Sequence, residues 1–305
     1  MSDPIRIPLP KLKHLYQKAV LSAARAKLSP GGSLKALPER PVLAEHPGLT
    51  EDQAEQYRRL VAGESFDGSH RRSLPSVMLH IAGFPVQMAL MSRDDFPLPL
   101  MGMVHLSNEV NHHQSVHAGT PLQILARAEN FASHRRGTQV DIVLEFYPKG
   151  LDVKTAGPQD QLYTSRSRYL GLGTYLYSKT EAATQVRQEF TPPSKTGVWT
   201  LGADAGRQYA AVSGDYNPIH LSTLTGKALG QKGAIVHGMY LAARMLEGRE
   251  PESAGHSWKI SFDAPVGLPG KVAFSAQQVN EKSQRFVGWN PRTVRRHFTG
   301  ELTLP

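Results

Sequence analysis

The segment Ser213–Met239, SGDYNPIHLSTLTGKALGQKGAIVHGM, gathers residue types that are able to do acid–base chemistry. It places a carboxylate, Asp215, and an imidazole, His220, on either side of Asn217-Pro218. The residue before a proline avoids the helical region and Asn-Pro is typical of turns, so we expect the chain to bring His220 back toward Asp215. Such a pair can hold and deprotonate a water molecule, or move a proton to and from carbon.

A second group in the same segment can stabilise negative charge on an oxygen. His237-Gly238 precedes the run MYLAARML, which predicts a helix that is buried on most sides. The start of a helix carries free N–H groups and the positive end of its dipole, and a glycine allows a carbonyl to approach closely. We therefore predict an oxyanion site at the N–H of Gly238, with Asn217, His237 and Met239 as candidates for substrate contacts.

The same residues also admit a metal and a purely structural interpretation. Asp215, His220 and His237 are metal-ligand types, but no two of them have the i,i+4 spacing of ligands on a helix, so we predict no metal and no cofactor. Asp-x-Asn-Pro alone is common turn chemistry. Only the ordered combination G-D-x-N-P-x-H, followed by H-G-M at the start of a buried helix, is specific.

The elements that position these residues follow from local patterns. A helix over Asp204–Val212 is expected to end at Gly214, which tolerates a positive φ, so that Asp215 lies in the loop directly after it. Alternating and β-branched runs predict strands in both halves of the chain. These are Met101–Val110, Leu122–Phe131, Val140–Tyr147 and Leu162–Leu170, then Trp258–Asp263, Lys271–Val279, Gln284–Trp289 and Thr293–Leu304.

The rest of the chain is interpreted more coarsely. Residues 1–70 are polar, rich in proline and expected to be irregular, apart from a short helix over Leu49–Gly63 that is capped by Thr50 and Gln53. Leu74–Met91 is strongly apolar and predicts a buried helix that is broken at Gly83 and Pro85. Residues 174–198 are expected to form a linker.

The two halves share an order of parts: a buried apolar helix, a strand, a turn marked by Gly and Pro, and longer strands. We interpret this order as a duplicated α+β unit in which a long helix is wrapped by an antiparallel sheet. The predicted parts are an N-terminal half over 1–173, which lacks G-D-x-N-P-x-H, the linker over 174–198, and a catalytic half over 199–305.

Composition narrows the class of protein. The chain has 305 residues, 40% of them hydrophobic and 20% charged, which is typical of a globular protein. It has no cysteine, which excludes disulfides and cysteine-based zinc sites. The N-terminus shows no signal peptide and no apolar run is long enough to span a bilayer, so we expect a cytoplasmic protein without a membrane partner.

The charge pattern points to anionic partners. Thirty-five Lys and Arg against 26 Asp and Glu give a formal net charge of +9. The clusters His134–Gly137 and Arg292–His297 suit the phosphates of coenzyme A or an acidic carrier protein, or are simply solvated faces. The histidine-rich Asn111–His117 is expected to be an exposed loop. No nucleic-acid reading element is present, so we predict no nucleic-acid partner.

The combination of motifs in Ser213–Leu246 resembles the MaoC-like dehydratases, also called (R)-specific enoyl-CoA hydratases, and the segments LPSVM, FPLPLMGMVHLSNEV and FDAPVGLPGKV resemble their double hot-dog subgroup. The resemblance implies a double hot-dog fold and the reversible conversion of an (R)-3-hydroxyacyl thioester to a trans-2-enoyl thioester and water. It implies that Asp215 and His220 handle the water and the C2 proton, and that Gly238 binds the thioester oxygen.

The resemblance also implies a role for the N-terminal half and leaves alternatives open. That half would be non-catalytic, would widen the acyl tunnel and would complete a pseudo-dimer. Its candidate lining residues, which are equally well explained as core, are Val77, Met78, Ile81, Met88 and Met91. The substrate thioester would be carried by coenzyme A or acyl carrier protein, and a homodimer is possible. A hot-dog thioesterase and a non-catalytic acyl-thioester-binding protein are the alternative functions.

Overall fold

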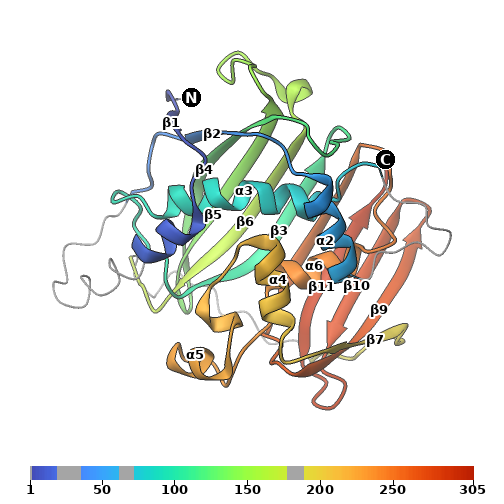
Figure 1. Ribbon diagram of the computed structural model, residues 1–305. Coiled ribbons are helices and arrows are strands. Elements are labelled where there is room, and N and C mark those ends of the chain that lie inside the picture. Colours follow the sequence, from blue (N-terminus) through green and yellow to red (C-terminus); the bar gives the residue numbers. More distant parts are fainter. Residues whose placement is uncertain (1, 19–35, 62–71, 177–188) are drawn as a thin grey trace. The chain divides into compact units, whose positions relative to one another are not determined.

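The computed structural model describes residues 2–18, 36–61, 72–176 and 189–305 (Figure 1). The chain divides into two compact units, each made of three segments. Unit 1 comprises Met1–Gly48, His80–Asn108 and Gly119–Val186, and unit 2 comprises Leu49–Leu79, Glu109–Ala118 and Arg187–Pro305. The assignment of residues 49–79 and 109–118 to unit 2 is not anticipated from the sequence. The roles of the two predicted halves stay predictions.

The sheet of unit 1 is mainly antiparallel. Its strands neighbour one another in the order β1, β2, β4, β5, β6, β3; β1 and β2 pair in parallel, and the pairs from β2 to β6 are antiparallel. The strands are β1 (Ile5–Ile7), β2 (Val42–His46), β3 (Met103–His112), β4 (Leu122–His134), β5 (Gly137–Pro148) and β6 (Tyr163–Leu172). The four strands predicted between residues 101 and 170 are confirmed, with ends shifted by a few residues.

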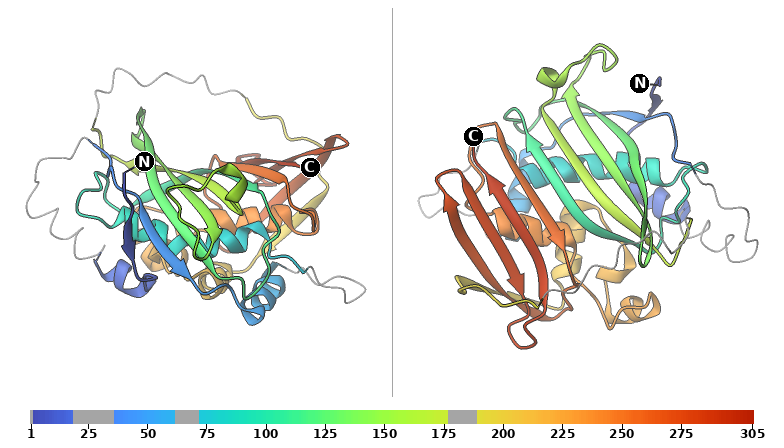
Figure 2. Two further views of the ribbon diagram at one scale, coloured as in Figure 1. Left: turned by 90° about the horizontal axis from the view of Figure 1, so that it is seen from above. Right: turned by 180° about the vertical axis from the view of Figure 1, so that it is seen from behind.

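The helix α3 (Ser76–Met91) lies along one face of the unit 1 strands (Figures 1 and 2). It is helical throughout, so the predicted break at Gly83 and Pro85 is wrong. Gly83 serves packing instead, because a Cβ there would lie 2.6 Å from Leu144 Cδ1 and 2.8 Å from Phe146 Cζ. Its absence lets the helix backbone approach the sheet closely.

The apolar residues of α3 belong to the core of the protein. All five candidates for acyl-tunnel lining are buried, with at most 8% exposed surface: Val77, Met78, Ile81, Met88 and Met91. This burial fits the interpretation as core, and the predicted role in an acyl tunnel stays a prediction.

The N-terminal residues are more ordered than expected. Residues 12–18 are helical, and β1 and β2 lie within the stretch that we predicted to be irregular, so that prediction is wrong for them. The predicted capping box is confirmed at α2 (Glu51–Val61): the N–H of Gln53 donates to Thr50 Oγ1 at 3.2 Å, and the N–H of Thr50 donates to Gln53 Oε1 at 2.8 Å. The predicted end of this helix at Gly63 lies outside the described residues.

The strands of unit 2 are antiparallel and follow the order β8, β11, β10, β9, β7. They are β7 (Gly197–Leu201), β8 (His256–Phe262), β9 (Gly270–Asn280), β10 (Ser283–Trp289) and β11 (Arg296–Thr303). The four strands predicted after residue 258 are confirmed. β7 is missed, because its first residues were assigned to the linker. Of that linker, residues 177–188 lie outside the described part of the chain, and 189–196 contain no helix or strand.

The helices described in unit 2 include α2, α4 (Ala205–Ser213), the 3₁₀ turn η3 (Pro218–His220), α5 (Thr223–Ala228) and α6 (Gly238–Leu246). The segment Ser213–Met239 runs from the end of α4 to the first turn of α6. In Figure 1 α6 lies beside β11 and β10, and a Cβ at Gly300 of β11 would collide with Met245 of α6. Each unit therefore packs an apolar helix on a sheet, and the predicted α+β class is confirmed.

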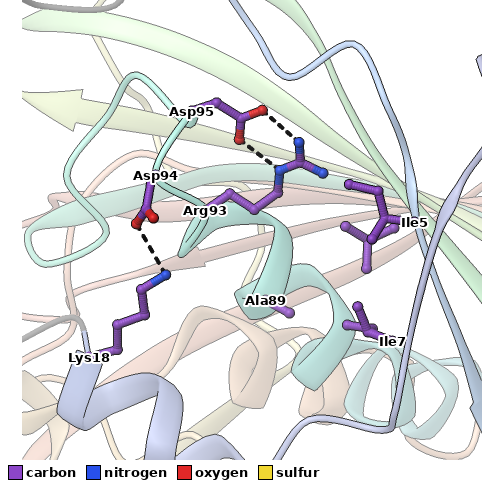
Figure 3. A pocket seen from close by; sticks show the side chains of 8 residues that line it. Ile5, Ile7, Lys18, Ala89, Arg93, Asp94 and Asp95 are labelled. Carbon is purple, nitrogen blue, oxygen red and sulfur yellow. Dashed lines mark hydrogen bonds and ion pairs between the residues drawn. The ribbon is translucent and has the colours of Figure 1, made fainter.

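Unit 1 also has a surface pocket of about 430 Å³. It is lined by Ile5, Ile7, Lys18, Val42, Ala89, Arg93, Asp94 and Asp95 (Figure 3). Its charged side chains are already paired, since Arg93 bonds Asp95 and Lys18 lies 3.2 Å from Asp94. The unit also contains a short 3₁₀ helix, η1 (Pro158–Asp160). Among the described residues, no helix is long and apolar enough to cross a membrane.

Candidate active site

The loop that carries Asp215 begins where α4 ends. Gly214 caps the helix with a φ of 73°, and its N–H donates to the carbonyl of Ala210, as the sequence predicts. Asp215 follows with 23% of its side chain exposed. Its backbone N–H donates to Ser213 Oγ at 3.1 Å, and its Oδ1 accepts the N–H of Asn217 at 3.2 Å. The carboxylate is therefore held by its own loop while one side stays open to solvent.

His220 is fixed by backbone that comes later in the chain. Its Nδ1 lies 2.8 Å from the carbonyl oxygen of Ile235, and the N–H of Ile235 donates back to the carbonyl of Ile219 at 3.1 Å. A carbonyl only accepts hydrogen bonds, so Nδ1 carries the proton in this arrangement. In the neutral ring Nε2 then has a free lone pair, which is the state that a general base requires.

His237 joins the two predicted catalytic residues. Its ring stacks on His220 with 3.7 Å between centroids, and its Nε2 lies 2.9 Å from the backbone oxygen of Asp215 and 3.8 Å from Asp215 Oδ2. One ligand-type atom of each of these three residues lies within 4.8 Å of the others. The expected return of His220 toward Asp215 is therefore present, and His237 ties the Asp215 loop to the start of α6.

Gly238 is the first residue of α6, with His237 as the N-cap. The N–H groups of the first helical turn have no partner within the helix, so the Gly238 N–H has the character that an oxyanion site requires. The structure adds a second reason for glycine here. A Cβ would lie 2.8 Å from Phe262 Cζ and about as close to two other ring atoms, so the Phe262 ring fills the space beside this backbone.

Asn217 and Met239, two further residues predicted to contact substrate, also have structural roles in the elements that carry them. Asn217 is the N-cap of η3, and its side chain accepts the N–H of Ile219 at 3.4 Å. Met239 is 6% exposed in the first turn of α6. Their predicted substrate contacts, and the catalytic roles of Asp215, His220 and Gly238, stay predictions.

Two positioning residues were missed by sequence analysis. A Cβ at Gly206 of α4 would overlap the carbonyl oxygen of His220, so only glycine allows the His220 backbone to lie against α4. The carbonyl of Ile235 is the second, because it sets the orientation of the His220 ring. Gly206 has no side chain and Ile235 acts through its backbone carbonyl, so neither could be recognised from residue type in the sequence.

Burial governs the protonation of the two histidines. It lowers the pKa of His220 to about 3, helped by the neighbouring His237 and opposed by Asp215. Burial also lowers the pKa of His237, and this shift is opposed by Asp215 and by the hydrogen bond to the Asp215 backbone. Both rings are therefore neutral near pH 7, and His220 keeps its Nε2 lone pair.

Because His220 is neutral, we expect activity and stability to depend on pH in different ways. A base whose pKa is about 3 stays unprotonated on mild acidification, so kcat/KM should show no fall through pH 6.5, the ordinary pKa of histidine. The unfolded chain takes up the proton near pH 6.5 and the folded chain does not, so the free energy of unfolding should fall below that pH. His220 alone contributes up to about 1.4 kcal/mol per pH unit, and His237 acts in the same direction. Initial rates and denaturant melts between about pH 5 and pH 8 measure both. An inflection of kcat/KM near pH 6.5 would contradict the assigned state of His220.

The histidine-rich segment Asn111–His117, which begins within β3, differs from its prediction. His113 and His117 are exposed as expected, but His112 is only 1% exposed and is the last residue of β3. The expectation of an exposed loop is wrong for Asn111 and His112, because β3 runs on to His112 and turns its side chain inward, and it is wrong for Val116, which is buried.

Comparison with known proteins finds a family model and solved structures that are similar to this chain. Residues 180–294 match the family model of the MaoC like domain, and this stretch holds Asp215, His220 and Gly238. A crystal structure of HtdX from Mycobacterium tuberculosis superposes with a TM-score of 0.70 at 23% identity, covering 86% of this chain and 99% of that one. A MaoC-like dehydratase from Phytophthora capsici gives a TM-score of 0.66 at 15% identity, covering 90% and 97%. The chain therefore has the double hot-dog fold that its sequence resemblance implies.

One curated relative is similar in sequence as well. The 3-hydroxyacyl-thioester dehydratase X of Mycobacterium tuberculosis is 33% identical over 189 residues, which are 61% of this chain and 63% of that protein. The chain thus matches somewhat less than two thirds of the relative's length.

Proposed function

We propose that this chain catalyses the reversible dehydration of (R)-3-hydroxyacyl thioesters to trans-2-enoyl thioesters, as a hydro-lyase of fatty-acid metabolism. The observation that carries the proposal is the convergence of Asp215 and a neutral His220 within 4.8 Å, next to the helix start at Gly238. The MaoC like domain match over the same residues and the dehydratase relative support it.

Each residue has a role in the hydration direction. Asp215 and His220 bind one water molecule, and the pair takes up its proton as the water oxygen bonds to C3 of the enoyl thioester. Electrons then accumulate on the thioester oxygen as an enolate, where the N–H of Gly238 donates a hydrogen bond. The proton returns from the pair to C2, the C1–sulfur bond stays intact, and the pair ends in its starting state.

The intact pair distinguishes this reaction from the two alternatives. A thioesterase attacks C1, and for that a single water-activating carboxylate and an oxyanion donor suffice. Addition at C3 also needs a proton delivered to the neighbouring C2, which two converging groups supply. A protein that only binds acyl thioesters has no need for a buried neutral histidine held at one nitrogen with its other nitrogen available.

The proposal also covers the carrier of the acyl group, the cellular compartment and the pairing of two chains. The thioester is carried by coenzyme A or acyl carrier protein, whose phosphates or acidic face suit the exposed arginines near residues 134–137 and 292–297. The N-terminal half contributes acyl binding and no catalytic group. The protein works in the cytoplasm, without a nucleic-acid or membrane partner, and pairing of two chains is compatible with this function.

Hydration of crotonyl-CoA tests the proposal. We expect loss of the enoyl absorbance, with (R)-3-hydroxybutyryl-CoA as the product on chiral analysis. The matched control is the Asp215→Asn variant purified in parallel, because it reveals any contribution from a contaminating hydratase. Formation of the (S) product, or equal rates in the two preparations, would argue against the assignment.

A further inference from the structure

A second group of metal-ligand side chains lies in unit 2, formed by residues that the proposed reaction does not use. His112 is the last residue of β3, Glu250 follows α6, and His256 is the first residue of β8. One ligand atom of each lies within 4.8 Å of the others. The side chains are 1%, 5% and 0% exposed, respectively, so the group is withdrawn from bulk water.

The contacts of His256 orient it as a ligand. Its Nδ1 lies 3.3 Å from the carbonyl oxygen of Ser253, and its Nε2 lies 2.8 Å from Glu250 Oε1. Both partners only accept, so a neutral His256 donates to one of them: to Glu250 from Nε2 when no metal is bound, or to Ser253 from Nδ1 when Nε2 binds a metal. In the second case the Nε2 lone pair and the Glu250 oxygen face one site, which a cation between them would occupy. A backbone carbonyl that holds the far nitrogen is also the usual support of a metal-bound histidine.

Glu250 provides the anionic ligand. Its Oε1 accepts the N–H of Ser76 at 2.9 Å, which fixes the carboxylate at the start of α3. A carboxylate with so little exposure is costly to desolvate, and a divalent cation offsets that cost through direct coordination. His112 completes the set, with its Nδ1 3.9 Å from Glu250 Oε1 and its ring 4.8 Å from that of His256.

The spacing suits a small ion. Two ligands that each stand about 2.0–2.1 Å from a tetrahedral Zn²⁺ are about 3.3 Å apart. The two distances from Glu250 Oε1, 2.8 and 3.9 Å, lie on either side of that value. Small rotations of the two imidazoles therefore place all three atoms around one ion. Two histidines and a carboxylate are ligands that Zn²⁺ accepts readily.

We propose that His112, Glu250 and His256 bind one divalent transition-metal ion, with Zn²⁺ as the fitting ion. The bound ion links the end of β3, the segment after α6 and the start of β8, and so stabilises the fold of unit 2. It takes no part in the reaction at Asp215 and His220, and the inference does not depend on the proposed function.

Metal content and spectroscopy test the site directly. The full-length protein is stripped with a chelator under mild denaturant, refolded, incubated with Zn²⁺ and dialysed before elemental analysis. We expect about one Zn²⁺ per chain and a higher Tm than for the stripped protein. Co²⁺ in place of Zn²⁺ should give the visible absorption of a low-coordinate site. No retained Zn²⁺ and an unchanged Tm would overturn the proposal and leave a hydrogen bond between His256 and Glu250 as the account of this contact.

Variants locate the ion. His256→Gln and His112→Asn keep polar side chains of similar size, and each should lose the Zn²⁺ and the Co²⁺ absorption while circular dichroism shows a folded protein. His113→Ala is the matched control, because the exposed neighbour of His112 should retain the full metal content. Zn²⁺ that survives in His256→Gln and His112→Asn, or that is lost in Asp215→Asn instead, would contradict the assignment to these ligands.

Discussion

Asp215→Asn and His220→Asn should each lower turnover by roughly 10²–10⁴-fold, the range expected when an acid–base group is lost. The two substitutions are chosen to leave the loop intact. The amide that replaces the Asp215 carboxylate keeps an oxygen for the N–H of Asn217, and the amide that replaces the His220 ring keeps a donor for the carbonyl of Ile235. Neither amide can exchange a proton at neutral pH. Steady-state kinetics with an enoyl thioester give the effect on kcat.

The double variant separates a shared role from two independent ones. Because both residues act on one water molecule, removing the second should cost little more than removing the first, so the effects should be far from additive. Tyr216→Phe is the control, since its ring lies in the same loop and is 51% exposed. Near-wild-type turnover in either single variant would remove that residue from the mechanism.

Gly206→Ala should produce the second large effect, although it removes no chemical group. The new Cβ would overlap the carbonyl oxygen of His220, which is backbone and has no rotamer to adopt. Either α4 or η3 has to shift, and a displacement on the scale of 1 Å at a catalytic group costs about 10²-fold in rate. The overpacking should also lower the free energy of unfolding by roughly 1–3 kcal/mol.

The kinetic split identifies the cause of the Gly206→Ala effect. A displaced His220 should lower kcat more than it changes KM, whereas simple loss of folded protein would lower the number of active sites and leave kcat per site unchanged. Gly197→Ala is the matched control, because a Cβ there meets nothing within 4 Å and should leave kcat and stability close to wild type. Equal behaviour of the two alanine variants would show that His220 does not depend on the close approach to α4.

The parts of the site that are local in sequence could be predicted, and the parts that depend on packing could not. Gly214 and Asn217-Pro218 have strong intrinsic backbone preferences, so the turn that carries Asp215 follows from them. The hydrogen bond from His220 to Ile235 depends on how the chain returns fifteen positions later, which no local preference encodes. The need for glycine at position 206 could not be predicted either, because it arises from contact with the His220 backbone later in the chain.

The errors in the fold have a similar origin. Gly83 and Pro85 are helix breakers in isolation, but close packing of Gly83 on Leu144 and Phe146 stabilises a continuous α3. His112 lies among polar neighbours, and only the length of β3 and the position of Glu250 show that it points inward. Tertiary contacts override the local signals at each of these positions.

The central claim is that Asp215 and His220 add water at C3 of the enoyl thioester, and the most direct test is to find which carbon receives the water oxygen. The enzyme is incubated with crotonyl-CoA in H₂¹⁸O, the products are separated, and the mass of each product is measured by mass spectrometry. The proposed role of the Asp215–His220 pair predicts that the label enters the C3 hydroxyl of an intact 3-hydroxybutyryl thioester, with no free thiol. Label in a free carboxylate, with thiol released at the rate at which the thioester disappears, would contradict it and assign the site to a thioesterase.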